Sequence, residues 1–302
     1  MTKIGIRRRI IVYIKKKLGI SLGLFHLYEG PLIRQPEAHT ATQTSNNQPM
    51  ISVVTPSYNQ GHFIAATINS VVGQNYSSLE YIIQDACSTD ETATIIATFG
   101  WTCLQAYYEE DHGQADAIAR GFSRSSGDIM CYLNSDDLMM PNTLQRVADF
   151  FHDHPQVDVV YGDRLVIDEN DRIVGDWRLP DHAENVTYLV DYVPQETLFW
   201  RRRIWDKVGG IDTSLQFAMD WDLILRFQAA GAQIHHLPEF LGAFRVHASQ
   251  KTHSAINVGK QEMALVRRRY TTRLRRLLLQ VPHILYLARH IQINRRPIKW
   301  YD

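Results

Sequence analysis

The segment Cys131–Pro141, CYLNSDDLMMP, contains a short apolar run followed at once by polar and acidic residues. The apolar run predicts a buried strand, and Pro141 predicts the start of a helix. Asp136 and Asp137 would repel each other and lose hydration at the end of a buried strand, and a divalent cation would relieve both effects. Taken alone, the segment fits a surface turn that caps the next helix equally well.

Strand and helix patterns alternate before this segment. We predict strands at 51–55, 79–84, 101–108 and 128–133 and helices at 62–72, 91–98 and 115–122. Such alternation is typical of a parallel sheet with helices on both faces, in which ligands bind at the carboxyl ends of the strands. Three polar loops follow these strands: PSYN at 56–59, DACSTD at 85–90 and NSDD at 134–137. The sequence therefore predicts one site formed by all three loops.

The pattern continues after Pro141 with shorter elements. We predict helices at 142–152, 201–208 and 220–230, strands at 157–161, 196–200, 233–237 and 240–246, and a hairpin that joins 165–167 to 172–176. Gly209 and Gly210 are expected to end the second of these helices. We find no internal repeat.

The composition is that of a globular protein. The 302 residues are 45% hydrophobic, which is enough for a full core. The three cysteines are widely spaced and form no disulfide or zinc pattern, so we expect a cytoplasmic protein. We expect neither a cleavable signal peptide nor a membrane span, since no apolar run reaches about 18 residues. The segment GFSRSSGD lacks a phosphate-loop signature, which excludes a Walker-type NTPase.

Basic residues gather at both ends of the chain. Residues 1–28 carry seven Lys and Arg and no acid, residues 266–302 carry ten and one, and the middle carries 15 and 31. The basic ends either contact the inner face of the cytoplasmic membrane or pack on the acidic body or a second subunit. In the first case 15–17 and 267–276 would lie near anionic lipid, with 277–279, Ile284 and Leu287 inserted. No nucleic-acid-binding motif accompanies the charge, so nucleic acid is not an expected partner.

Four motifs in fixed order give the chain a family resemblance. VTPSYNQGHFIAATINSVVGQNY, DACSTD, DHGQADAIARGFSRSSGDIMCYLNSDD and VGGIDTSLQFAMDWDLILRF resemble family-2 glycosyltransferases over roughly Ile51–Ser249. The resemblance implies an α/β GT-A fold, a Rossmann-like mixed sheet flanked by helices, here with basic helical extensions at both ends. We expect an amphipathic extension at 1–34, a linker at 35–49, a GT-A domain at 50–255 and a basic helical region at 256–302. The domain would divide into a nucleotide-binding half, 50–140, and an acceptor half, 141–255.

The resemblance also implies a site for a nucleotide-sugar donor, with a UDP-sugar favoured. The residues implied to line it are Thr55, Pro56, Ser57, Tyr58, Asp85, His112, Gly113, Gln114, Asp116, Asn134 and Ser135. Asn134, Ser135 and Asp136 occupy the place of the family's Asp-X-Asp motif. Asp136 would bind Mn²⁺ or Mg²⁺, His247 is the candidate third ligand, and Asp137 ranks below Asp136. Asn134 is a weaker metal ligand than the usual Asp, and Cys87 stands where the family usually has Gly.

The motif FAMDWD aligns Asp220 with the catalytic base of an inverting transferase. One carboxylate within hydrogen-bond reach can take the proton of the attacking acceptor hydroxyl. Met219 replaces the Glu that commonly precedes this base, and Asp222 is expected to be structural. Gln195 and Glu196 fall where acceptor contacts occur in the family.

The sequence thus predicts a metal-dependent glycosyltransferase with a saccharide or lipid-linked acceptor, active in cell-surface polysaccharide or glycolipid synthesis. A catalytically silent glycan- or lipid-binding scaffold is the alternative, because Asn134 and Met219 depart from the family pattern. A sugar nucleotidyltransferase is disfavoured, because PSYNQGHF has no Lys or Arg in the loop after the first strand.

Overall fold

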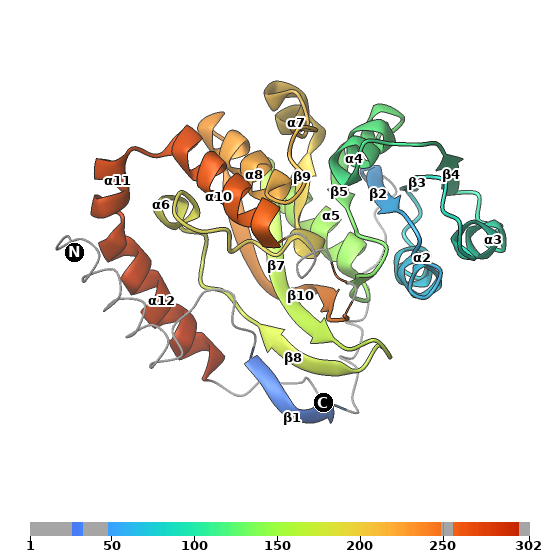
Figure 1. Ribbon diagram of the computed structural model, residues 1–302, viewed down its shortest axis with the longest axis horizontal. Coiled ribbons are helices and arrows are strands. Elements are labelled where there is room, and N and C mark those ends of the chain that lie inside the picture. Colours follow the sequence, from blue (N-terminus) through green and yellow to red (C-terminus); the bar gives the residue numbers. More distant parts are fainter. Residues whose placement is uncertain (1–25, 33–47, 249, 251–255, 296–302) are drawn as a thin grey trace.

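The computed structural model describes residues 26–32, 48–248, 250 and 256–295 (Figure 1). The helix expected in the basic segment before residue 26 and most of the expected linker at 35–49 lie outside these residues. Among the helices described, none is both long and apolar enough to cross a membrane.

Ten strands of the described chain form one mixed sheet with the order β1-β8-β7-β9-β5-β2-β3-β4, while β10 pairs with β7 and β6. The strands are β1 (His26–Leu32), β2 (Ile51–Ser57), β3 (Leu79–Asp85), β4 (Leu104–Tyr108), β5 (Ile129–Tyr132), β6 (Leu138–Met139), β7 (Val159–Ile167), β8 (Ile173–Trp177), β9 (Phe199–Arg201) and β10 (Ile234–Arg245). The parallel strands β2, β3, β4 and β5 confirm the alternation read from the sequence.

The helices and turns described are α2 (Ile64–Val72), α3 (Thr92–Ala97), α4 (Gln114–Ser123), α5 (Thr143–Asp153), α6 (Glu184–Thr187), the 3₁₀ turn η1 (Gln195–Thr197), α7 (Arg202–Val208), α8 (Met219–Ala229), α10 (Ile256–Tyr270), α11 (Arg273–Leu278) and α12 (Gln280–Asn294). The six helices predicted from the sequence correspond to α2, α3, α4, α5, α7 and α8. Each end lies within two residues of the predicted one, so these predictions are confirmed. Gly209 ends α7 with a φ of 77°.

Two apolar cores lie on opposite faces of the sheet. In β2, Val54 belongs to the core under α4 and α8, whereas Ile51 and Val53 belong to the core under α2 and α5. Alternate residues of a strand point to opposite faces, so this central strand is buried throughout because both faces are covered.

Four expectations for single elements were wrong. The strands expected at 157–161 and 165–167 are one strand, β7. β1 was not predicted, and it pairs with β8 as the outer strand at that end of the order. Residues 196–198 were expected in a strand, but η1 occupies 195–197 after Pro194. The strands expected at 233–237 and 240–246 are one strand, β10, whose pairing with β7 shifts register between Leu237 and Phe240, so the irregularity accommodates Pro238.

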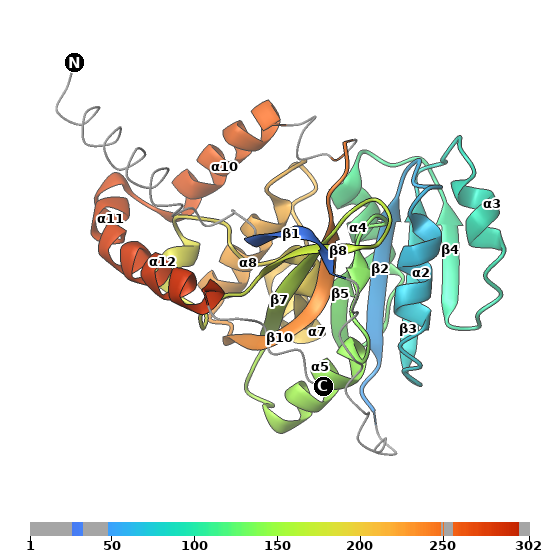
Figure 2. The same ribbon diagram turned by 90° about the horizontal axis from the view of Figure 1, so that it is seen from below.

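The C-terminal helices lie at the end of the molecule opposite α3 and β4 (Figures 1 and 2). α10 contacts α8, and α12 contacts α6. The helical character predicted for residues 256–302 is thus found over the described part of that region.

The close approach of β10 to η1 generates a stability prediction. A Cβ added to Gly242 would lie 2.7 Å from the carbonyl oxygen of Glu196, which is backbone that has little room to move. We expect Gly242→Ala to lower the free energy of unfolding by about 1–3 kcal/mol, measured by urea denaturation. Gly100→Ala is the control, because its Cβ would meet nothing within 4 Å. Equal stability of the two variants would contradict this tight packing.

Candidate functional site

A cavity of about 1030 Å³ opens where β2 and β5 end and where α4 and α8 begin. Many of the residues singled out in the sequence line it: Pro56, Ser57, Tyr58, Gly113, Gln114, Asn134, Ser135, Asp136, Asp137, Gln195, Glu196 and Asp220. Segments more than 150 residues apart in the chain therefore meet at one site. This is the position at which parallel α/β sheets bind ligands.

The first two polar loops are hydrogen-bonded to each other. The backbone N–H of Asn59 donates to the Ser88 hydroxyl at 2.8 Å, and the N–H of Thr89 donates to the Asn59 side chain at 2.8 Å. Asp90 accepts from the N–H of Gly61 at 3.0 Å and from the N–H of Thr92 at 3.0 Å. These bonds hold the rim formed by the ends of β2 and β3 in one shape.

Two residues predicted to contact the nucleotide-sugar donor, Asp85 and Thr55, lie beneath this rim. The Asp85 carboxylate is fully buried and accepts from the N–H and the hydroxyl of Ser88, each at 2.7 Å. The Thr55 hydroxyl is buried 3.1 Å from the Tyr81 hydroxyl. Neither residue is among those lining the cavity, and their roles as nucleotide contacts stay predictions. Cys87 has a left-handed φ of 57°, which accounts for the Gly usual at this position.

Two further residues predicted to contact the nucleotide-sugar donor, His112 and Asp116, lie beside the cavity wall. The backbone N–H of His112 donates to Asp116 at 3.0 Å, and the Asp116 carboxylate pairs with Arg120 at 2.8 Å. The His112 side chain is 89% exposed. Of this segment, Gly113 and Gln114 reach the cavity, so any closure of His112 and Asp116 over a base also stays a prediction.

The third polar loop, NSDD, is held by a buried arginine from β10. The backbone N–H of Arg245 donates to Asp137 Oδ1 at 3.0 Å, and Arg245 Nε donates to the carbonyl of Asp136 at 2.7 Å. From the other side, the Thr67 hydroxyl lies 2.9 Å from the carbonyls of Ser135 and Asp137. The loop is thereby fixed by two elements distant in sequence.

Asp136 and His247, the two predicted metal ligands, are in contact. His247 Nε2 lies 3.1 Å from Asp136 Oδ2. A carboxylate beside an imidazole is a donor set that suits Mn²⁺, and Mg²⁺ commonly takes one or two protein carboxylates with its other positions filled by water and phosphate. No group of three His, Cys, Asp or Glu side chains suited to a metal ion occurs in the described part of the chain. The pair therefore fits a cation whose coordination a bound ligand completes.

Asp137 has a different environment from Asp136. Its Oδ2 accepts from Asn134 at 3.2 Å while Oδ1 accepts from Arg245, so both oxygens already have partners. Burial, followed by repulsion from Asp136 and Glu196, raises the pKa of Asp137 well above its usual range. These contacts suit a residue that shapes the loop, in line with its lower rank as a ligand.

Asp220 lies at the start of α8 and faces the cavity. Its Oδ1 accepts from the N–H of Trp221 at 2.8 Å. The preceding backbone is held by Glu262 of α10, whose carboxylate accepts N–H groups of residues 216, 217 and 218 at 2.7–3.0 Å. Asp222 is fully buried and pairs with Arg226 at 2.8 Å, which agrees with a structural role.

A buried ion pair supports the opposite wall. Arg164 of β7 donates to both oxygens of Glu196, at 2.6 and 2.7 Å, with both side chains almost fully buried. Gln195 donates to the carbonyl of Tyr132 at 2.6 Å and accepts from Asn134 at 3.0 Å. The predicted acceptor residues are therefore fixed to β7 and to the end of β5.

The lining carries far more acid than base. Its described residues include seven carboxyl groups and a single guanidinium, that of Arg164: Glu110, Asp111, Asp136, Asp137, Asp191, Glu196 and Asp220. Burial and then the charge of Asp220 raise the pKa of Asp191 well above its usual range, while Arg164 opposes the shift. Even though the pKa values of Asp137 and Asp191 are raised and Glu196 is paired with Arg164, acidic groups outnumber basic ones in the lining, so the cavity favours cations over a bare phosphate group.

The sequence did not single out Arg164 or Asp191. Arg164 was the one basic residue in the apolar stretch VVYGDRLVI, which is a signal that a buried ion pair was needed. Asp191 precedes Tyr192 in an irregular segment, and nothing in its local sequence marks it.

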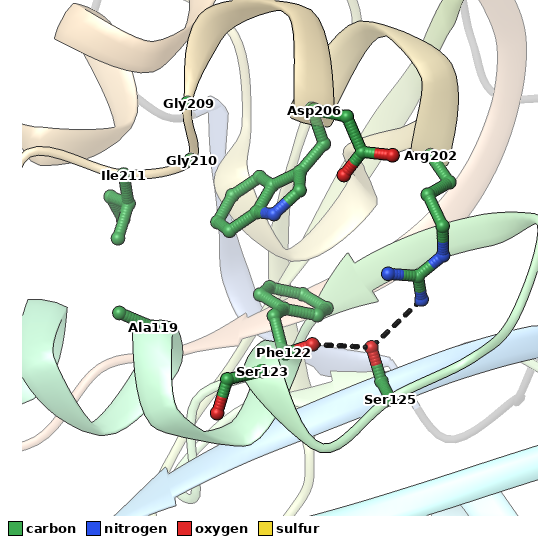
Figure 3. Close-up of a pocket in the computed structure, with 10 residues that line it drawn as sticks. Ala119, Phe122, Ser123, Ser125, Arg202, Asp206, Gly209, Gly210 and Ile211 are labelled. Carbon is green, nitrogen blue, oxygen red and sulfur yellow. Dashed lines mark hydrogen bonds between the residues drawn. The ribbon is translucent and has the colours of Figure 1, made fainter.

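A second hollow, of about 490 Å³, lies between α4 and α7 (Figure 3). Its Arg202 donates to the carbonyl of Gly127 at 2.7 Å and to the Ser125 hydroxyl at 2.9 Å. The Arg202 side chain is thus used in hydrogen bonds within the protein, and none of the predicted site residues line this hollow. We therefore take the larger cavity as the candidate site.

A mixed sheet with a polar cavity where its parallel strands end is the architecture of α/β proteins that bind small ligands at that edge. Residues 52–217, more than half of the chain, match the family described as Glycosyl transferase family 2, and the chain belongs to this family. A PGL/p-HBAD biosynthesis glycosyltransferase of Mycobacterium bovis (strain BCG / Pasteur 1173P2) is 29% identical over 184 residues, 59% of this chain and 69% of that protein.

Solved structures share the fold at lower identity. S. aureus TarS 1-349 in complex with UDP-GlcNAc has a TM-score of 0.60 and 19% identity, covering 72% of this chain and 66% of that chain. Mannosyltransferase PcManGT from Pyrobaculum calidifontis in complex with GDP-Man and Mn²⁺ has a TM-score of 0.55 and 19% identity, covering 82% and 67%. The GT-A-like fold expected from the sequence, a central mixed sheet flanked by helices, is confirmed.

The buried ion pair gives a prediction that separates pairing from packing. We expect Arg164→Met to lower the free energy of unfolding by about 3–5 kcal/mol, because Glu196 would stay buried without its partner. Arg164→Met/Glu196→Met should be more stable than Arg164→Met alone, since both charges are removed together. Urea denaturation of the two single variants and the double variant measures the coupling, and purely additive losses would contradict it.

Proposed function

We propose that this protein is an inverting glycosyltransferase that moves a sugar from a nucleotide-diphosphate donor to a hydroxyl of a saccharide or lipid-linked acceptor. The observation that carries the proposal is that Asp136, in contact with His247, and Asp220 border one cavity. Asp136 would thus be placed to hold a divalent cation together with His247, and Asp220, at the start of α8, would be placed to accept a proton. Residues 50–255 form the proposed catalytic domain, with the donor half before residue 141 and the acceptor half after it.

The charge of the cavity supports dependence on a divalent cation. A nucleoside diphosphate is strongly anionic, and the described lining opposes it with seven carboxyl groups and one guanidinium. Mn²⁺ or Mg²⁺ held by Asp136 and His247 would supply Lewis-acid stabilisation of the leaving diphosphate. The rim residues Ser57, Tyr58 and Gln114 would contact the donor, and a UDP-sugar is the favoured one.

Asp220 is the proposed base. Its carboxylate would accept the proton of the acceptor hydroxyl as that oxygen attacks the anomeric carbon, which inverts the configuration without a protein nucleophile. Met219, beside it, is buried and lines the cavity. Gln195 and Glu196 would then bound the acceptor side of the cavity.

The proposed acceptor and its setting are supported by a relative. The mycobacterial protein named for PGL/p-HBAD biosynthesis supports a role in glycolipid assembly, with surface polysaccharide as the other substrate class. A lipid-linked acceptor would bring the protein to the inner face of the cytoplasmic membrane.

Donor class and metal use are tested together by thermal shift. UDP-, GDP- and dTDP-sugars are added with Mn²⁺ or with a chelator, and a ligand present at a hundredfold excess over its Kd stabilises the native state by about 3 kcal/mol. We expect one nucleotide class to raise the Tm with Mn²⁺ and to lose that effect with chelator. Asp136→Asn should lose it too, whereas Asp206→Asn, an exposed residue of the second hollow, should keep it. No shift with any donor would favour the silent scaffold.

The base is tested separately. Asp220→Asn keeps the size of the side chain but cannot take a proton at neutral pH, so we expect donor turnover to fall by about 10²–10⁴-fold while the donor still raises the Tm. Release of nucleoside diphosphate measures turnover, with Asp206→Asn as the control. Full turnover in Asp220→Asn would remove this residue as the base.

A further inference from the structure

One side of the C-terminal helices is apolar and exposed. Six large apolar side chains of α11 and α12 are between 57% and 70% exposed: Leu274, Leu277, Leu278, Val281, Ile284 and Leu285. Their spacing of three or four residues places them along one side of a helical segment. We call this set the apolar ridge. The other large apolar side chains of the described residues, Tyr58 of the cavity rim excepted, are at most 51% exposed.

The opposite side of α12 is packed on the protein. His283, Tyr286, Leu287 and His290 are buried, and the Tyr286 ring lies 4.8 Å from the Tyr192 ring. Leu279 and Leu287 were expected to insert in lipid, but both are buried against the body of the protein, so this expectation was wrong. The helices are therefore docked by one face while the apolar ridge lies on the other.

The helices that carry the apolar ridge contain basic residues and no acidic ones, and Arg289 at the far end of the ridge pairs with Asp181 at 3.0 Å. From residue 273 to residue 294 the chain has four arginines and no acid. Arg275 stacks on Tyr188 at 4.0 Å, while Arg273 is exposed at the start of α11 and Arg276 lies in its last turn. An apolar stripe beside arginines is the pattern of helices that lie in the interface of an anionic membrane.

Charge decides between the candidate occupants. The N-terminal segment of this chain carries seven Lys and Arg and no acid over residues 1–28, and a second copy would present the same basic ridge. The N-terminal segment, or the same ridge of a second copy, would meet the arginines of α11 with like charge, whereas an anionic lipid surface has the complementary charge. We propose that the apolar ridge docks this protein on an anionic lipid bilayer, with Arg273 and Arg276 at the headgroups.

The docking surface is joined directly to the candidate site. Tyr192, which the ridge-bearing helix contacts through Tyr286, lines the cavity. In α10, Arg269 donates to Asp222 at 3.2 Å, two residues from Asp220. A bilayer bound at the ridge would therefore hold the acceptor half at a fixed position relative to lipid. This inference rests on the proposed function in one respect, namely that the acceptor is located at a membrane.

Vesicle co-sedimentation of the full chain, without donor or acceptor, tests the surface. We expect retention on vesicles of phosphatidylcholine with phosphatidylglycerol and little on phosphatidylcholine alone. Leu277→Asp/Leu278→Asp/Leu285→Asp should weaken binding by more than about tenfold, because carboxylates replace inserted side chains. Trp101→Asp, which alters a 51% exposed side chain between α3 and β4, is the matched control and should bind as wild type. Arg273→Gln/Arg276→Gln should remove most of the preference for the anionic lipid.

The Asp variant should keep the circular dichroism of the wild type and its donor-dependent Tm shift, because all three positions are exposed. Loss of vesicle binding with that shift intact would therefore separate the surface from the donor site. No retention of the wild type on either vesicle, or equal retention of the Leu-to-Asp variant, would overturn the proposal. Self-association of the wild type that the variant abolishes would also overturn it and assign the ridge to a second copy.

Discussion

The rest of the structure depends on the parallel pairing of β2 with β3 on one side and β5 on the other. Ser57 pairs with Asp85, and Val54 pairs with Tyr132, so the polar loops that follow these strands emerge along one edge. A slip of one residue would exchange the two faces of β2 and move Val54 from one core to the other. The apolar cores on both faces therefore set the register, and the register sets the position of every loop at the cavity.

Buried guanidinium groups then hold the acidic loops in place. Arg245 ties the NSDD loop to β10, and Arg164 ties Glu196 to β7. Carboxylates left buried without such partners would oppose folding by several kcal/mol each. The cavity wall can therefore contain many acidic residues, because Arg245 and Arg164 bind the acidic segments within the protein. On the side that faces the cavity, the acidic groups would be stabilised by positive charge. This is where the donor and its cation are proposed to bind.

The parts of the fold and site that sequence predicted are those with local signals. Apolar runs with alternating helices predicted β2–β5 and their loops, and the acidic motifs predicted the positions of Asp136 and Asp220 at one cavity. Arg164, Asp191 and Glu262 were missed because their partners lie 29 to 46 residues away in the chain, as the pairs Arg164–Glu196, Asp191–Asp220 and Glu262–Gln216 illustrate. The expected lipid-facing set was wrong at Leu279 and Leu287, which are buried, for the same reason. The exposed side of an amphipathic helix follows from what the other side packs against, so Leu278 is exposed and Leu279 buried.

Glu262 has a consequence for how the molecule opens. Its single carboxylate caps three consecutive amides ahead of α8, two of which belong to Gln216 and Phe217 at the cavity wall. Release of α10 would expose these amides together, so this contact couples the stability of α10 to that of the cavity wall. A shortened chain that ended before α10 would lose this cap along with the helix. The C-terminal helices thus contribute to the stability of the cavity wall, although the family match ends at residue 217.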